Sequence, residues 1–314
     1  MFLNKNKILL VKRESVYGTD SVPTVSENAI EAKNIKIEYN GDLLERDLVR
    51  STLSNSAPIM GQRWAELSFQ VEIKGSGTKG TAGRIGDALV ACGLTETAAA
   101  GSSVTYTPCD STFLSATAYL YELQDSGNCK LHKVTGCRGT VSFDFEAGKI
   151  ATAEIKLQGL IDEITDETDP SAPTYETTTP PIVENSTLTL NSVATLIAQA
   201  VKIDMANEVV KQDDLNSATG LKGFLITGRK PAGTINPEAV LKATYDFVGD
   251  WQAATERALS LVLGSAAGNK LTVTAPKLVL EKVGAGERNG IRTEDLAFRL
   301  ASNAGGDELV LKFE

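Results

Sequence analysis

Strict alternation of apolar and polar side chains is the feature that most restricts what this chain can fold into. Between Glu66 and Lys74 every second residue is apolar, beginning at Leu67 and ending at Ile73. A period of two puts the apolar side chains on one face of a strand and the polar ones on the other. Antiparallel sheets with one packed and one hydrated face have this pattern, whereas strands of parallel sheets are apolar throughout. We therefore expect the chain to build on antiparallel sheets.

The same alternation occurs in two pairs of runs that are separated by turn residues. Residues 141–157 contain two runs on either side of Ala147-Gly148, and residues 296–313 contain two more. Each pair predicts a β-hairpin with one buried face. Helices are predicted at residues 81–92 and 246–263, because a glycine follows each segment. The predicted fold class is mainly β, with one flanking α-helix in each half.

The two halves of the sequence resemble each other. Residues 35–47 and 201–213 agree in character at most positions, and the expected helix starts near Gly80 and Asp246 keep the same offset. The two hairpins, at 142–159 and 296–313, recur at a smaller offset. Recurrence of several features in the same order indicates a duplicated domain. Two unrelated β-rich domains remain the alternative.

The predicted organisation has two domains with a distinct segment between them. Between Leu157 and Val201 the chain has no Lys or Arg, and carboxylates are interleaved with prolines and threonines. Such a composition resists burial and favours an extended linker. The first residues lack the apolar periodicity for a core of their own. The boundaries are an N-terminal arm at 1–31, a first β domain at 32–160, an acidic Pro/Thr-rich linker at 161–190 and a second β domain at 191–314.

Composition argues against several functional classes. The formal net charge is -9, whereas nucleic-acid binding needs a basic face. No apolar run reaches the roughly 20 residues of a membrane span, and we expect synthesis in the cytoplasm. His132 is the only histidine, and the four cysteines include no CxxC pair. A zinc site or a Cys/His dyad at Cys129, His132 and Cys137 is therefore less favoured than buried free cysteines. No catalytic, metal-binding or cofactor-binding residue is predicted.

Residues 75–80 match the GxGxxG pattern of dinucleotide-binding loops. The strand before such a loop should be almost wholly apolar, and an acidic residue should follow a second strand about 20 positions later. The preceding strand alternates instead, and residues 98–104 contain only Ala, Gly, Ser and Val. We interpret these glycines as a flexible connection into the first helix.

Several segments resemble the major tail tube protein family of long-tailed bacteriophages, of the siphophage type. The resemblance spans nearly the whole chain, and none of its strings is a catalytic signature. The segments are Val16-Tyr-Gly-Thr-Asp20 with Pro23, Glu45-Arg-Asp-Leu-Val-Arg50, residues 69–77, Ala91-Cys92-Gly93, Lys130-Leu-His-Lys133, residues 136–146 and residues 226–238.

This resemblance implies two tandem β-sandwich domains whose inner sheets join between subunits into a closed β-barrel around a bore. The implied function is that of a structural virion protein, made in the host bacterium, whose stacked rings form the tail tube that delivers DNA. A chain with two copies of the domain should form homotrimer rings with pseudo-sixfold symmetry; a homohexamer is the second choice. Expected partners are the chain itself, the tape measure, tail terminator and distal tail proteins, and double-stranded DNA that passes without specific binding.

Two groups of residues are candidates for these roles. An acidic bore wall would repel phosphates, and the bore candidates are Asp144, Glu146, Glu154, Glu294 and Glu308, which could equally be ordinary exposed residues. The charged excursions between strands are long for hairpin loops and contain apolar residues, which favours docking on the next ring over a mobile surface hairpin. The ring-stacking candidates are Leu43, Leu44, Glu45, Arg46, Asp47 and Arg50 in one excursion and Glu208, Lys211 and Asp213 in the other.

Two other functional classes fit the sequence less well. An enzyme would have to work with carboxylates alone, or with His132 and a nearby cysteine, and no spacing selects a pair. A monomeric β-rich adhesion or carbohydrate-binding module fits the composition better and is the alternative function.

Overall fold

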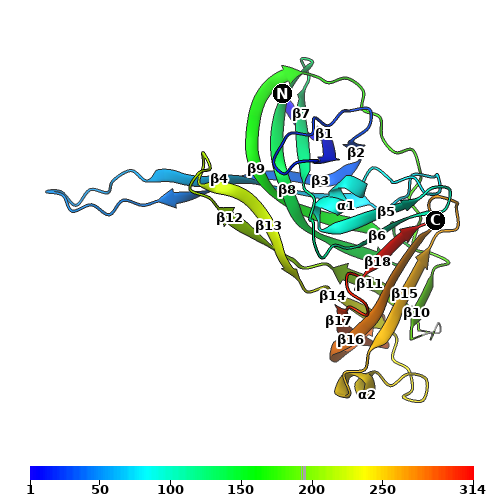
Figure 1. Ribbon diagram of the computed structural model, residues 1–314. Coiled ribbons are helices and arrows are strands. Elements are labelled where there is room, and N and C mark those ends of the chain that lie inside the picture. Colours follow the sequence, from blue (N-terminus) through cyan, green and yellow to red (C-terminus); the bar gives the residue numbers. More distant parts are fainter. Residues whose placement is uncertain (192, 194–195) are drawn as a thin grey trace.

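The computed structural model describes residues 1–191, 193 and 196–314, and it confirms a mainly β chain (Figure 1). The first half contains β1 (Phe2–Arg13), β2 (Ala29–Ile30), β3 (Ala32–Leu44), β4 (Ile59–Glu72), α1 (Gly86–Ala91), β5 (Leu94–Ala99), β6 (Ser103–Pro108), β7 (Ala116–Gln124), β8 (Asn128–Glu146) and β9 (Thr152–Thr168). The second half contains β10 (Thr187–Leu190), β11 (Ala198–Asp204), β12 (Asn207–Asp213), β13 (Leu221–Arg229), β14 (Ala232–Pro237), α2 (Phe247–Gln252), β15 (Arg257–Leu263), β16 (Leu271–Arg288), β17 (Ile291–Ala301) and β18 (Val310–Phe313).

One continuous run of antiparallel strands passes through both halves, and we call it the central sheet. Its order is β3-β4-β9-β8-β11-β14-β17-β16, so the two halves meet where β8 pairs with β11. The order within the first four strands is repeated in the last four. The two outer edges of the central sheet are β3 and the C-terminal part of β16.

The repeated order is accompanied by a repeated register. The pairs β3–β4 and β11–β14 correspond at a constant offset, as Lys36↔Ser68 and Lys202↔Thr234 show, and each has a bulge near the corresponding position. Likewise, β7–β8 and β15–β16 correspond at a constant offset with matching bulges, as in Ala118↔Val134 and Leu259↔Ala275. The two halves therefore share the pairing of their strands and not only the strand order.

The predicted C-terminal hairpin at 296–313 is wrong. β17 pairs with β14 and β16, whereas β18 pairs with β16 and with β6 of the first half. The counterpart of the hairpin β8–β9 is therefore β16–β17, and the offset between these hairpins is smaller than the sequence match indicated. Alternation shows that a segment is a strand but does not select its partner. Pro276, Gly284 and Gly286 interrupt the apolar pattern of β16, which hid this strand in the sequence.

The second predicted helix is also largely wrong. Only α2 is helical, and residues 257–263 form β15, in which Leu259, Leu261 and Leu263 are buried on one face. This period of two is that of a strand. Asp246 does cap the short helix, because its carboxylate accepts a 2.9 Å hydrogen bond from the Gly249 N–H. The first helix is likewise shorter than predicted, at six residues.

The predicted N-terminal arm and linker are partly built into sheets. β1 pairs along β7, and its residues 8–11 are buried, so the arm is packed against the first half. β9 extends to Thr168, so the first eight residues of the predicted linker form a strand. β10, near the end of that segment, pairs with β15. The irregular stretch between the halves is confined to residues 169–186.

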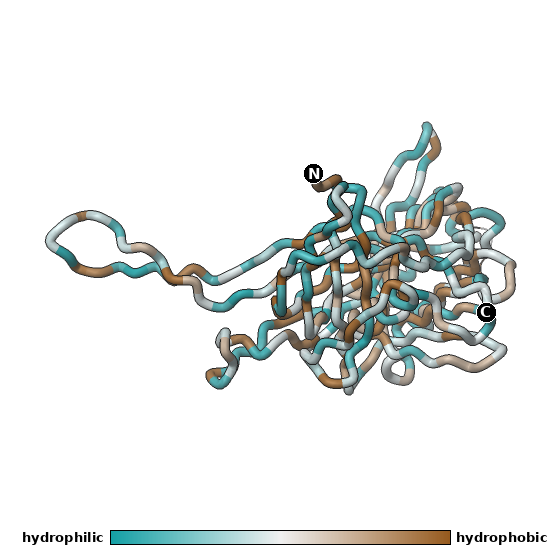
Figure 2. Tube along the Cα trace, turned by 90° about the horizontal axis from the view of Figure 1, so that it is seen from above, coloured by the Kyte–Doolittle hydropathy of each residue, from teal (hydrophilic) through white to brown (hydrophobic). Residues whose placement is uncertain are grey.

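One large hydrophobic core is shared by both halves, and apolar segments lie inside the molecule in Figure 2. The GxGxxG glycines contribute to this junction. The Gly75 N–H donates a 2.8 Å hydrogen bond to Asn269 Oδ1, and a Cβ at Gly75 would lie 2.1 Å from the Gly268 carbonyl oxygen. Glycine is therefore required for close backbone contact between the halves, beyond the flexible connection predicted from sequence.

Candidate assembly surfaces

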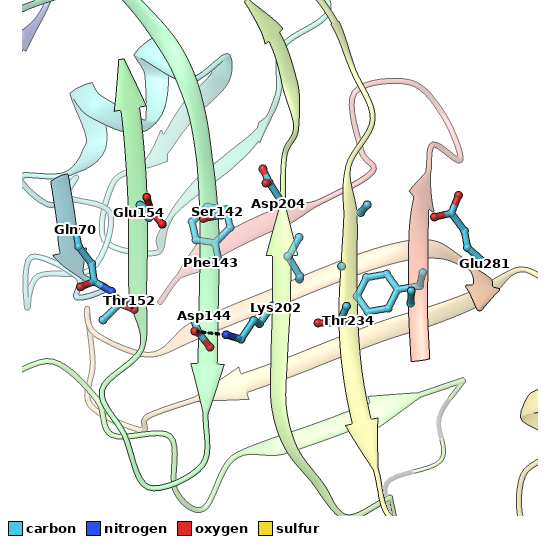
Figure 3. A pocket seen from close by; sticks show the side chains of 15 residues that line it. Gln70, Ser142, Phe143, Asp144, Thr152, Glu154, Lys202, Asp204, Thr234 and Glu281 are labelled. Atoms are coloured by element: carbon cyan, nitrogen blue, oxygen red, sulfur yellow. Dashed lines mark hydrogen bonds and ion pairs between the residues drawn. The ribbon is translucent and has the colours of Figure 1, made fainter. Parts of the chain in front are cut away.

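The central sheet has one apolar face, packed in the core, and one polar face. On β8, Phe143 and Phe145 are buried, whereas Ser142 and Asp144 lie on the other face. β9, β11 and β14 continue the polar face with Glu154, Lys202, Asp204 and Thr234, as the close-up in Figure 3 shows. These side chains line a shallow hollow centred on the β8–β11 pair.

The charges on the polar face are mixed. Lys202 Nζ lies 3.0 Å from Asp144 Oδ2, which forms an ion pair across the β8–β11 junction. Strand alternation also assigns cations to this face, among them Lys33, Lys36, Lys156, Lys202, Lys282, Arg288 and Arg299. Carboxylates are interleaved with these cations, among them Glu38, Glu66, Glu72, Asp144, Glu146, Glu154, Asp204 and Asp295.

The five predicted bore residues do not all share this face. Asp144, Glu146 and Glu154 lie on it together. Glu294 lies on the core-facing side of β17, in phase with the buried Leu296 and Phe298, and its side chain is only 17% exposed. Glu308 lies in the connection between β17 and β18, where its carboxylate pairs with Arg229 at 3.0 Å.

β3 and β4 continue beyond the sheet into a long projecting hairpin, residues 41–61, which extends away from the body in Figures 1 and 2. The predicted residues Leu43 and Leu44 lie at the end of β3. Glu45, Arg46, Asp47 and Arg50 lie in the exposed connection at the tip. The hairpin also exposes Leu48, Val49, Leu53, Ile59 and Met60. So many exposed apolar side chains on one extension indicate a contact surface.

The second predicted excursion forms the hairpin β12–β13, which lies against the base of the projecting hairpin. Lys211 Nζ lies 3.0 Å from Asp42 Oδ2 and 4.0 Å from the centre of the Trp64 ring. Gln62 donates a 2.7 Å hydrogen bond to Asp213 Oδ1.

Two of the predicted stacking residues, Lys211 and Asp213, thus contact the base of the projecting hairpin. Glu208 lies near the opposite end of β12. Sequence reasoning missed Asp42, Gln62 and Trp64. The aromatic Trp64 at a polar position of the alternation was the available signal.

The sequence matches the family model described as phage tail tube protein over residues 4–300. The chain belongs to this family. No curated protein matches it significantly. Membership makes this tail tube protein a structural component of the virion that assembles with itself into a tube. No helix of the described residues is long and apolar enough to cross a membrane.

The only histidine of the tail tube protein joins β8 to the base of the projecting hairpin. His132 Nδ1 is hydrogen-bonded to the Tyr39 hydroxyl, and Nε2 lies 3.4 Å from Glu122 Oε2. Burial lowers the pKa of His132, although Glu122 opposes this effect. Burial raises the pKa of Tyr39 to about 12, so the phenol remains a neutral hydrogen-bonding group at neutral pH.

The cysteines near this histidine do not form a cluster with it. Cys129 and Cys137 are free and buried, and burial raises the pKa of both thiols. Within residues 1–191, 193 and 196–314, no three His, Cys, Asp or Glu side chains are grouped so that they could hold a metal ion.

Proposed function

We propose that this tail tube protein forms rings that stack into the tube through which double-stranded DNA is delivered, as in siphophage tails. The observation that carries the proposal is the central sheet, which has one packed face, one polar face and two edges without a partner among the described residues. Unpaired edges favour association with other strands, and closure around a ring removes them. The polar face then lines a hydrated bore.

We infer that the chain contains a duplicated domain and that each ring is a homotrimer with pseudo-sixfold symmetry. The repeated strand order and registers of the two halves support the duplication. Three chains would supply six similar modules, and a closed ring satisfies every interface with one repeated contact. A homohexamer is the second choice, and it would double the mass of the ring.

The bore residues of this proposal are Asp144, Glu146 and Glu154, together with the other charged residues of the polar face. Carboxylates interleaved with the cations of this face would repel phosphates and oppose tight DNA binding, so DNA passes without being held. Glu294 and Glu308 are left out of the bore, because they lie away from the polar face.

The projecting hairpin is proposed to dock on the next ring through Leu43, Leu44, Glu45, Arg46, Asp47 and Arg50. Glu208, Lys211 and Asp213 are proposed to hold the adjacent hairpin β12–β13 in the same contact. The ends of the tube would meet the tape measure, tail terminator and distal tail proteins.

Negative-stain microscopy of the purified full chain, with native mass spectrometry of its smallest rings, tests this function. We expect hollow tubes and a ring mass of three chains. A chain that stays monomeric at high concentration would exclude the tube, and glycan binding by that monomer would support the adhesion alternative instead.

A pair of variants tests the stacking role. The triple variant L48S/V49S/L53S should fold and form single rings without tubes, because these side chains are exposed in the isolated chain. The control is Leu241→Ser, in the exposed connection between β14 and α2, which should still give tubes. Tubes of normal length from the triple variant would exclude docking through this tip.

A further inference from the structure

We propose that neighbouring chains join by antiparallel pairing of β16 of one chain with β3 of the next, in the register of the internal β8–β11 junction. This inference rests on the proposed ring. Its central pair is Ile37↔Ala285, flanked by Lys36↔Gly286 and Glu38↔Gly284. The partner is a second copy of this chain.

The internal junction provides the template. β11 lies at the edge of the second four-strand set, and β8 lies at the edge of the first, where they pair as Ile203↔Phe143 and Lys202↔Asp144. The Met205 N–H extends this contact with a 3.0 Å hydrogen bond to the Val141 carbonyl. Two edges of the repeated sets are therefore already joined once within the chain.

The same two edge positions remain free at the ends of the central sheet. β3 takes the place of β11, because its pairing with β4 repeats that of β11 with β14, so that Ile37 corresponds to Ile203. β16 takes the place of β8, and beyond its bulge at Glu281 the residue that corresponds to Phe143 is Ala285. Residues 282–288 of β16 pair with β17 on one side, and no strand of the described structure pairs with them on the other side.

The apolar side chains at the two free edges are complementary to this pairing. Ile35 and Ile37 on β3, and Val283 on β16, are only partly buried although they pack against the large core. In the proposed register these residues lie on the same face, as Ile203 and Phe143 do inside the chain. Pairing would complete their burial and continue the core between chains.

The charged side chains at the two edges also fit. Inside the chain Lys202 pairs with Asp144, whereas the corresponding positions at the free edges are Lys36 and Gly286. The carboxylate of Asp295 stands over this glycine, since a Cβ at Gly286 would lie 2.5 Å from Asp295 Oδ2. Lys36 of the next chain would therefore meet Asp295, and the ion pair is retained although its anion comes from the neighbouring strand.

The helix α2 ends the free edge at the point where the template requires it. Trp251 Nε1 donates a 3.0 Å hydrogen bond to the Glu281 carbonyl, just before the free stretch. At the internal junction the Asn207 side chain caps the Gly139 carbonyl in the same way, also at 3.0 Å. The edge from Lys282 onward is left open for a strand.

Paired cysteines test the register in the full-length protein. Two of the proposed pairs suit a disulfide, namely Lys36↔Gly286 and Glu38↔Gly284. Their counterparts in the β8–β11 junction are pairs whose backbones do not hydrogen-bond to each other, and in such pairs the side chains are closest. Gly284 tolerates a side chain, because its Cβ would meet only ordinary contacts and its counterpart is Ser142. E38C/G284C should give, under mild oxidation, a ladder on non-reducing gels that ends at the covalent trimer.

Two controls define the outcome. E38C/A285C places the cysteines on opposite faces, and N40C/G284C tests a slip of two residues, so neither should cross-link above the single-cysteine background. Rings with no E38C/G284C bond, or with a stronger bond in a control, would overturn the register and leave the proposed function intact. If the wild-type protein forms no rings, both proposals fail.

A charge reversal provides a second readout that does not depend on disulfide geometry. Lys36→Glu should reduce the ring fraction at least tenfold, because it faces Asp295 of the neighbour, and K36E/D295K should restore it. A double variant that assembles no better than Lys36→Glu would overturn the Lys36–Asp295 contact.

Discussion

The two halves of the chain share a strand register but differ in what extends from it. In the first half β3 and β4 run without interruption from the central sheet into the projecting hairpin. In the second half the corresponding strands are broken, so that β12–β13 forms a separate two-stranded sheet. Two residues at the break explain it. Ala206 has a φ of 46°, and its N–H bonds to Asp204 Oδ1 and so is not available to a neighbouring strand. Pro231 has no N–H with which to continue the sheet. The core fixes the register, while local backbone chemistry decides how far each hairpin projects.

The sharpest test of this comparison places the same charge at the two corresponding edge positions. Ile203→Asp, at a position 1% exposed, should lower the free energy of unfolding by about 3–5 kcal/mol, because it buries an unpaired carboxylate. Ile37→Asp should cost the isolated chain less, about 1–2 kcal/mol, because Ile37 packs against the core but a carboxylate there stays hydrated. Urea unfolding of the dilute proteins measures both. Equal losses would show that Ile203 and Ile37 are buried to the same extent.

Much of the register could be predicted from the sequence, whereas the partners of the strands could not. The match of 35–47 with 201–213 located β3, β11 and β12 because apolar positions with a period of two are visible in a single segment. β15 was mistaken for the end of a helix, since Leu259, Leu261 and Leu263 follow a well-capped helical start. β18 looked like the return strand of a hairpin because pairing with β6, which belongs to the first half of the chain, leaves no local signal.

The candidate residues show the same division. Asp144, Glu146 and Glu154 were found as polar members of alternating strands, and the structure places them on one face. Glu294 lies on the same side of β17 as the buried residues. Glu308 lies in the connection between β17 and β18, and the course of that connection depends on how β18 pairs. The Lys211–Asp42 contact joins two hairpins far apart in the sequence, so only the folded chain reveals it.

The first strands of the halves, β1 and β10, provide the next contrast. The buried Glu14 directly follows β1, and its carboxylate accepts hydrogen bonds from Ser115, Thr117 and the N–H groups of Gly18 and Gly136. Glu14→Ala leaves these donors unsatisfied and should cost about 2–3 kcal/mol in urea unfolding. The control is Thr187→Ala on β10, at an exposed position, which should stay within about 0.5 kcal/mol of wild type. A loss below about 1 kcal/mol for Glu14→Ala would contradict a stabilising role for this carboxylate.

The contact between the two hairpins should be weaker. Lys211→Met removes the ion pair with Asp42 and the contact with the Trp64 ring, and should lower the free energy of unfolding by about 1 kcal/mol. A double-mutant cycle with Asp42→Asn isolates the ion pair, for which we expect a coupling of about 0.5 kcal/mol. Lys222→Met on β13, also exposed, is the matched control. Zero coupling would mean that the hairpins lie together without this ion pair.

The smallest effect is expected where the second half reaches the first, at the C-terminal end of β18. Hydrogen bonds from Lys270 and Lys312 lower the pKa of Glu314 to about 2. A carboxylate whose pKa is lowered by folding stabilises the protein above its unfolded pKa, near 4.5, and loses this contribution as the pH falls toward 2. Glu314→Gln should therefore cost less than about 1 kcal/mol at pH 7, because the group is solvent-screened, and nothing near pH 2. Urea unfolding of both proteins at the two pH values measures this, and a difference that persists at pH 2 would mean that packing of β18, and not its charge, was altered.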